Sequence, residues 1–257
     1  MTPAARPGVD VHQALVSAAA VHRCAGLLDA AERDRAARLP APAAARFTVA
    51  RGLLRSVLAD RLGVPPGRVS LTARCPGCGG AGHGPVRLTA HHGGGDRDGY
   101  GGAAGDAGWA LSVAHSGSLV AVAVGHRAGP VGVDVETAER AEHIEELAPR
   151  LFRPDQRDRL ARLPAPARRA ALLRAWTGAE SYAKATGTAL GRALARVDAT
   201  VDTGGRVAVA APDRLAGWSV RAVPARAPGY AAAVTARHGT RVRTHPRTDL
   251  TAGPPAG

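Results

Sequence analysis

Two long stretches with helical periodicity, one in each half of the chain, most constrain the fold. Between Pro42 and Leu62 apolar residues recur every three or four positions, and Gly63 and two prolines end the run. The second stretch runs from Arg168 to Thr186 and is followed by Gly187, a typical helix C-cap. Each stretch predicts an amphipathic helix that must bury one face against another layer of structure.

Short apolar segments between turn residues predict strands around these two helices, and a charged helix is expected from Glu139 to about Arg150. The predicted strands comprise residues 109–114, 119–124, 131–135, 207–210, 218–223 and 230–235. The sequence therefore predicts an α+β fold in which two similar halves, each with one long helix and several strands, pack as a pseudodimer around a shared cleft.

The break at Gly129 and Pro130 suggests where the halves meet. We expect an N-terminal α+β half over residues 1–128 and a C-terminal α+β half, with the metal-binding and catalytic motifs, over residues 129–238. The glycine-rich segment 93–108 is expected to be a flexible loop. Residues 239–257 are polar and rich in proline and glycine, so we expect a disordered tail.

Composition excludes several protein classes. Hydrophobic residues make up 45% of the chain but aromatic residues only 3%, so the core must consist mainly of Ala, Leu and Val. No uncharged apolar run is long enough to span a membrane, and no signal peptide is evident. Three cysteines, an odd number, argue against a secreted disulfide framework, so we expect a reducing, cytoplasmic location.

The net charge of +13 suits nucleic acid, an anionic surface, a polyphosphate ligand or an acidic protein partner, and does not choose among them. Of the 34 lysine and arginine residues, only Lys184 is a lysine. A lysine can release a proton and an arginine effectively cannot, so a single lysine in an arginine-rich chain suggests a chemical role.

Two groups of residues could carry chemistry. Asp134 and Glu136 are two apart on a predicted strand, so their carboxylates share a face and could hold one hard cation, although a solvated strand edge would look the same. Trp176, Glu180 and Lys184 are spaced four apart on the second helix and form one stripe. An ordinary surface ion pair between Glu180 and Lys184 is the alternative.

Other catalytic motifs are missing. Cys75, Cys78 and His83 could bind zinc, but no second ligand pair follows at the usual spacing. The sequence has no Gly-x-x-x-x-Gly-Lys phosphate loop, no His-Glu-x-x-His and no Gly-x-Ser-x-Gly motif. The enzyme classes that depend on those motifs lose support.

The segments Gly132-Val-Asp134-Val-Glu136 and Trp176-Thr-Gly-Ala-Glu180-Ser-Tyr-Ala-Lys184-Ala-Thr-Gly187 resemble the two signature motifs of phosphopantetheinyl transferases. Residues 50–55, 75–85 and 112–117 resemble further segments of the large, single-chain members, which serve bacterial polyketide and nonribosomal peptide synthesis. Five matches in the same order make a chance resemblance implausible, although each alone is weak.

This resemblance implies a magnesium-dependent enzyme of the holo-acyl-carrier-protein synthase type. Such an enzyme transfers the 4'-phosphopantetheine arm of coenzyme A to a serine of an apo acyl or peptidyl carrier protein and releases adenosine 3',5'-bisphosphate. Asp134, Glu136 and Glu180 would bind Mg²⁺ beside the pyrophosphate of coenzyme A. Glu180 would also help to remove the serine proton, and Lys184 would stabilise or protonate the leaving phosphate.

The same resemblance assigns the remaining coenzyme A contacts. His115 would contact a phosphate and take part in catalysis, and Arg51 would pair with the 3'-phosphate. Arg46 and Arg87 are expected to make nearby contacts. Carrier proteins of this kind are acidic, so the basic chain would attract them, and we expect a monomer that binds neither nucleic acid nor membrane.

The chain departs from the family pattern at three positions. Ala179 stands where the family has a lysine, which removes a positive charge expected beside the phosphates, and Ser112 and Ala114 stand where asparagine and serine are usual. A degenerate homologue that binds coenzyme A without transferring its arm is therefore one alternative. A basic nucleic-acid-binding protein is another, although the chain has only three Tyr and two Phe for base stacking.

Overall fold

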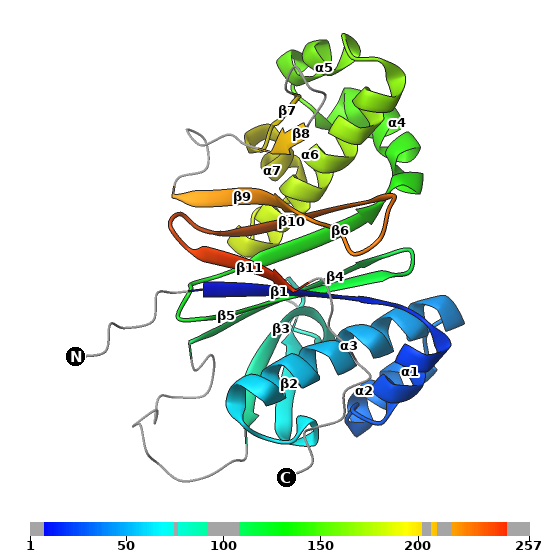
Figure 1. Cartoon of the computed structure of the whole chain (residues 1–257), viewed down its shortest axis with the longest axis vertical. Helices are drawn as coiled ribbons and strands as arrows, with labels where there is room; N and C mark the ends of the chain where they lie inside the picture. The colour runs from blue at the N-terminus through cyan, green and yellow to red at the C-terminus, as the bar shows by residue number, and fades with distance from the viewer. Residues whose placement is uncertain (1–7, 75–76, 92–107, 202–206, 210–216, 246–257) are drawn as a thin grey trace, which may run out of the picture.

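The computed structural model describes residues 8–74, 77–91, 108–201, 207–209 and 217–245 (Figure 1). The elements that precede the break at Gly129 are β1 (Gly8–Leu15), α1 (Ala18–Ala25), α2 (Ala30–Ala37), α3 (Ala41–Leu62), β2 (Val69–Arg74), β3 (Ala81–His91), β4 (Trp109–Ser116) and β5 (Leu119–His126). The elements that follow it are β6 (Gly132–Thr137), α4 (Ala141–Leu151), α5 (Pro154–Ala161), α6 (Ala165–Thr186), α7 (Leu190–Arg196), β7 (Ala199–Val201), β8 (Val207–Val209), β9 (Trp218–Val223), β10 (Tyr230–Arg237) and β11 (Arg241–His245).

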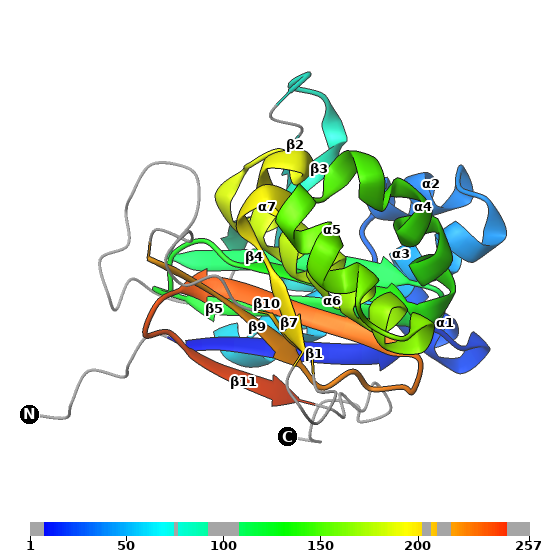
Figure 2. The ribbon, with the colours of Figure 1, turned by 90° about the horizontal axis from the view of Figure 1, so that it is seen from above.

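Two sheets form the centre of the fold. The larger has the strand order β11-β1-β5-β4, and the smaller has the order β6-β10-β9. Helix α3 packs on the first sheet through β5, and α6 packs on the second through β6 and β10. Helices α4 to α7 gather over one side of the strands, and α1 to α3 lie on the opposite side (Figure 1). The view from above has α4 to α6 in front of the strands (Figure 2). The predicted α+β class is confirmed.

Strands β4 and β6 lie side by side where the two sheets meet. Each is the last strand of its sheet, and the two strands contact one another along their length. The proposed division between residues 128 and 129 falls in the connection from β5 to β6, next to this junction. Residues that end β4 and residues on β6 are therefore brought together from opposite sides of that division.

The two long helices lie where the sequence predicts them. Helix α3 has proline in its first turn and ends at Gly63, whose φ of +64° is the left-handed conformation that glycine adopts at little cost. Its leucines Leu53, Leu54 and Leu58 are fully buried against β5. Helix α6 also starts with a proline in its first turn and ends at Gly187.

Helix α6 and strand β6 approach so closely that only glycine fits at the start of the strand. A Cβ atom added to Gly132 would lie 1.9 Å from the backbone oxygen of Ser181 and 2.7 Å from the backbone nitrogen of Ala185. The glycine of the Gly-x-Asp-x-Glu motif is thus a packing requirement. It sets the distance between the strand with the paired carboxylates and the helix with Glu180 and Lys184.

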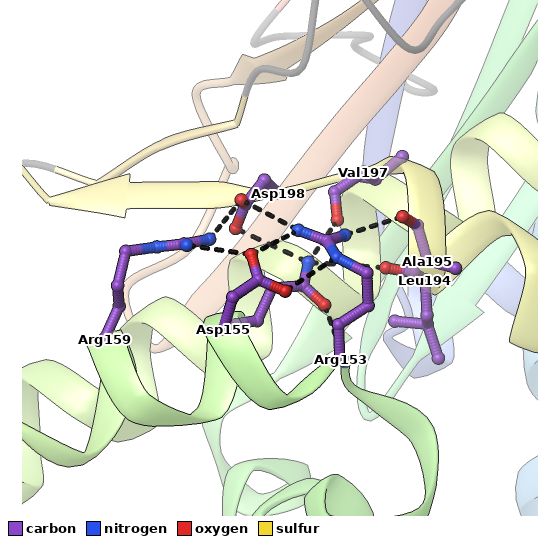
Figure 3. Close-up of polar contacts among 8 residues, drawn as sticks. Arg153, Asp155, Arg159, Leu194, Ala195, Val197 and Asp198 are labelled. Carbon is purple, nitrogen blue, oxygen red and sulfur yellow. Dashed lines mark hydrogen bonds and ion pairs between the residues drawn. The ribbon is translucent and has the colours of Figure 1, made fainter.

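Polar contacts tie α5 to the segment after α7 (Figure 3). Arg153 donates to the backbone oxygen of Ala195 at 2.6 Å and contacts Asp155 at 2.9 Å, while Arg159 pairs with Asp198. The buried amide of Gln156 donates to the backbone oxygen of Val197 at 2.9 Å. These bonds fix the helical layer that covers α6.

The expectation of a disordered tail from residue 239 is wrong for residues 241–245, which form β11. This strand pairs in parallel with β1, and Arg243 and His245 both contact the buried carboxylate of Asp10, at 2.9 and 2.8 Å. Arg61 of α3 binds the same carboxylate at 2.6 Å. A buried carboxylate needs charged or hydrogen-bonding partners, and its contacts with Arg243 and His245 hold β11 in place. Residues 246–257, like the glycine-rich residues 93–107, lie outside the described part.

Candidate active site

Asp134 and Glu136 on β6 are both buried, with 5% and 8% of their surface exposed. They alternate with Val133 and Val135, which pack in the apolar cluster between the sheets. Because Gly132 has the same parity and abuts α6, the two carboxylates lie on the strand face that α6 covers. The solvated strand edge that the sequence left open is therefore wrong.

Lys184 reaches from α6 to β6. Its Nζ donates to Asp134 Oδ1 at 2.7 Å and to the backbone oxygen of Val133 at 3.2 Å. Burial raises the pKa of Asp134 to about 7, Lys184 opposes this rise, and the negative charges of Glu136 and Glu180 add to it. Glu180 of α6 therefore lies near enough to Asp134 for its charge to act on that carboxyl group.

Glu136 has contacts of a different kind. The hydroxyl of Ser116, at the end of β4, donates to Glu136 Oε2 at 2.6 Å. The guanidinium of Arg140 lies 3.6 Å from the same oxygen and 6.0 Å from the centre of the Trp176 ring. Glu136 is thus held by one residue from each side of the junction between the sheets.

The donor set fits a hard divalent cation in kind. Asp134 Oδ2 is buried without a hydrogen-bond partner, and each carboxylate uses one oxygen for protein contacts, Oδ1 in Asp134 and Oε2 in Glu136. Magnesium takes few protein oxygens and completes its shell with water and phosphate. Within the described residues, however, no three His, Cys, Asp or Glu side chains are already gathered around a metal position, so a cation would bind with a shift of these side chains.

His115 lies on β4 next to Ser116 and is accessible to solvent. Desolvation by the surrounding protein lowers its pKa, and so do the positive charges of Arg46 and Lys184, while Glu136 opposes them. Three other residues named from the sequence, Arg46, Lys184 and Glu136, therefore act electrostatically on His115. A neutral imidazole at this position is able to donate or accept a hydrogen bond.

Arg51 lies on α3 at a separate pocket of about 350 Å³ between α2, α3 and β2. Its side chain is buried, which lowers its pKa, and its Nε lies 3.7 Å from Glu32. Its guanidinium also lies over the ring of Phe47, as does that of Arg35. The pocket is lined by Asp29, Ala31, Glu32, Arg35, Arg38, Phe47, Arg51, Leu71, Thr72 and Ala73.

The comparisons with known proteins address the same part of the chain. Residues 130–235, which hold both signature motifs, match the model of the 4'-phosphopantetheinyl transferase superfamily. The second half of the chain is thus similar to that superfamily. The chain is also 32% identical over 147 residues to 4'-phosphopantetheinyl transferase HetI of Nostoc sp. (strain PCC 7120 / SAG 25.82 / UTEX 2576), a match that covers 57% of this chain and 54% of HetI. The chain thus spans about half the length of this curated relative.

The structure locates two of the positions at which the sequence departs from the family pattern. Ala179, where the family has a lysine, is 0% exposed and packs in the apolar cluster of α6. Ser112 accepts a hydrogen bond from the backbone nitrogen of Val133 at 3.0 Å and so links β4 to β6.

The other predicted positions are described by the structure only in part. Arg87 lies exposed on β3. Cys75 and the side chain of His83 lie outside the described residues, so the zinc alternative stays a prediction.

The sequence did not indicate Ser116 or Arg140 as site residues. Ser116 directly follows His115, and the strand period places it on the opposite face of β4, toward β6. Arg140 follows Glu136 by four residues, but a strand ends and a 3₁₀ turn begins between them. The alternation of side chains along the strand could have indicated the contact of Ser116, but no pattern in the sequence indicates that of Arg140.

Proposed function

We propose that this chain is a magnesium-dependent phosphopantetheinyl transferase of the large, single-chain type, with holo-acyl-carrier-protein synthase activity. It would move the 4'-phosphopantetheine arm of coenzyme A to a serine of an apo carrier protein. The observation that supports this best is the contact of Lys184, the single lysine of the chain, with Asp134 at 2.7 Å in a buried acidic region. An ordinary surface ion pair with Glu180 would not bring the lysine to β6.

Asp134, Glu136 and Glu180 would hold Mg²⁺. When bound, the ion would neutralise charge on the pyrophosphate and polarise its phosphorus-oxygen bonds. The unpartnered Oδ2 of Asp134 supports this assignment. A third of the Lys184 side chain is exposed, and its aliphatic stem is flexible. The ammonium group can therefore turn from Asp134 toward a phosphate.

The residues of α6 would supply the proton transfers. Glu180 would accept the proton of the carrier serine, directly or through water, as the serine oxygen attacks the β-phosphate of coenzyme A. The bond from this phosphorus to the bridging oxygen breaks, and adenosine 3',5'-bisphosphate leaves. Lys184 would stabilise or protonate that leaving phosphate, and His115 would contact a phosphate of coenzyme A.

The pocket beside α3 would take the adenosine end of coenzyme A. Arg51 would pair with the 3'-phosphate, for which a guanidinium is geometrically suited, and Arg35 and Arg38 line the same pocket. The ring of Phe47 offers an apolar surface. Arg46 and Arg87 would make nearby contacts.

The partners would be coenzyme A and acidic acyl or peptidyl carrier domains. The net charge of +13 supports attraction of an acidic protein. We propose a cytoplasmic monomer of secondary metabolism that uses neither nucleic acid nor membrane as a partner. No described helix is long and apolar enough to cross a membrane.

The test is to incubate the protein with a fluorescent coenzyme A and a panel of apo carrier proteins, with Mg²⁺ or with EDTA. We expect label on a carrier serine only with Mg²⁺, and little label with Lys184→Ala, whereas Arg192→Ala, an exposed charge change on α7, should behave like the wild type. Coenzyme A binding without labelling of any carrier would instead favour the degenerate homologue. Salt-sensitive binding of duplex DNA without either would favour the nucleic-acid alternative.

A further inference from the structure

Ser116 joins the edges of the two sheets through its side chain. Its Oγ accepts a hydrogen bond from the backbone nitrogen of Thr137 at 3.2 Å and lies 2.6 Å from Glu136 Oε2. A backbone N–H can only donate, so the serine proton is left for the carboxylate. The distance of 2.6 Å is typical of a hydroxyl that donates to a charged carboxylate.

The position of this hydroxyl is fixed from several sides. Ser116 is buried, and the turn that follows it is held by Tyr230 of β10, whose hydroxyl accepts from the backbone nitrogen of Ser118 at 2.9 Å. Gly117 between them must be glycine, since a Cβ there would lie 2.5 Å from the Tyr230 hydroxyl. These contacts hold the backbone of Ser116 in place beside Glu136.

The bond to Ser116 limits the orientation of Glu136. Arg140 also approaches Oε2, so among the described residues both contacts of this carboxylate fall on one oxygen. A carboxylate held in this way presents its other oxygen, Oε1, in one orientation. Hydrogen bonds to a ligating carboxylate set its geometry and strengthen metal binding.

We propose that Ser116 is a positioning residue for the divalent-cation site, acting through Glu136. This inference rests on the proposed function, because it takes Glu136 as a metal ligand. Ser112 provides the matched comparison: it is buried on the same face of β4 and also bonds to β6, but through the backbone nitrogen of Val133 rather than through a carboxylate.

The experiment measures Mn²⁺ binding by electron paramagnetic resonance, with and without coenzyme A, for the wild type, Ser116→Ala and Ser112→Ala. We expect Ser116→Ala to weaken Mn²⁺ binding by about tenfold or more and Ser112→Ala to leave it within about twofold. Excess Mg²⁺ should restore carrier labelling in Ser116→Ala. Thermal melting checks that each variant is folded.

A second pair of variants separates the effect of the hydroxyl group from that of side-chain packing at position 116. Ser116→Thr and Ser116→Val have nearly the same shape and differ only in a hydroxyl, so the comparison holds even if both are less stable. We expect Thr to bind Mn²⁺ more tightly than Val. Equal affinities within this pair, or no Mn²⁺ binding by the wild type, overturn the inference. Weaker Mn²⁺ binding in Ser116→Ala without labelling of any carrier by the wild type would support the inference and reject the proposed transfer.

Discussion

Lys184 Nζ and Asp134 Oδ1 lie 2.7 Å apart although 50 positions separate the residues in the chain. The contact joins the two signature motifs, one on α6 and one on β6, at the interface where Gly132 lets the helix and the strand approach closely. In the proposed enzyme the same lysine would serve the leaving phosphate, so its charge has two possible partners. Variants at this position can separate the two roles.

Lys184→Ala should reduce carrier labelling by at least about 100-fold, because both the charge and the proton donor are lost. Lys184→Arg should keep the charge but not the proton transfer, and should restore binding of coenzyme A more than turnover. Single-turnover labelling together with calorimetric binding of coenzyme A checks this. A Lys184→Arg variant as fast as the wild type would show that no proton comes from this residue.

Gly132→Ala should destabilise the fold by about 2 kcal/mol or more, since the added methyl group would overlap the backbone of α6. Gly191→Ala is the control, because a Cβ there meets nothing within 4 Å. Urea denaturation gives the free energy of unfolding of both. Equal stability of the two variants would mean that α6 and β6 are less closely packed than described.

Arg51→Ala should raise the Kd for coenzyme A by about tenfold or more, as a charge-assisted hydrogen bond to the 3'-phosphate is lost. The same substitution should have little effect on 3'-dephospho-coenzyme A. Isothermal titration with both ligands gives the comparison, and Arg23→Ala, an exposed residue of α1, controls for net charge. An equal loss for both ligands would place Arg51 away from the 3'-phosphate.

His12 should make the fold sensitive to acid. Its ring stacks on His245 at 4.3 Å, and burial, together with the charge of His245, lowers its pKa to about 4. The unfolded chain takes up this proton near pH 6.5, so the folded state binds fewer protons and its stability, complete above pH 6.5, falls as the pH drops toward 4. The maximum slope from one group is about 1.4 kcal/mol per pH unit.

His12→Asn should flatten this dependence in denaturation curves recorded between pH 7 and 4, and His22→Asn, on the exposed side of α1, should not. Asp10 also faces this pair. Burial alone would raise the pKa of Asp10, but its hydrogen bonds to Arg243, His245 and Arg61 outweigh this effect and lower the pKa. Its own contribution is lost only at still lower pH. Unchanged slopes in His12→Asn would show that another group controls acid unfolding.

The sequence was sufficient for α3 and α6, because each has an apolar period and ends at a glycine, and it also predicted α4 and most strands of the two central sheets. It did not reveal β1, whose apolar residues are interrupted by Asp10, His12 and Gln13. Asp10 and Gln13 are buried because they bond to distant segments, Gln13 to Pro224 and Arg226, and Asp10 to Arg243. Partners this far away leave no local pattern.

For the candidate site, spacing alone placed Asp134 and Glu136 on one face and Glu180 and Lys184 on one stripe. It could not show that the lysine reaches Asp134, since the distance between β6 and α6 depends on Gly132 and on the packing of the whole second half. Nor could it show the pocket beside α3, which α2 and β2 help to form.

The parallel pairing of β1 with β11 affects how the protein is made. Asp10 leaves the ribosome 233 residues before Arg243, so its carboxylate lacks this partner while nearly all of the remaining chain is synthesised. During that time the edge of β1 is open to other strands. The sheet of the first half can therefore be completed only after the second half has been translated, and the two halves acquire their final stability together.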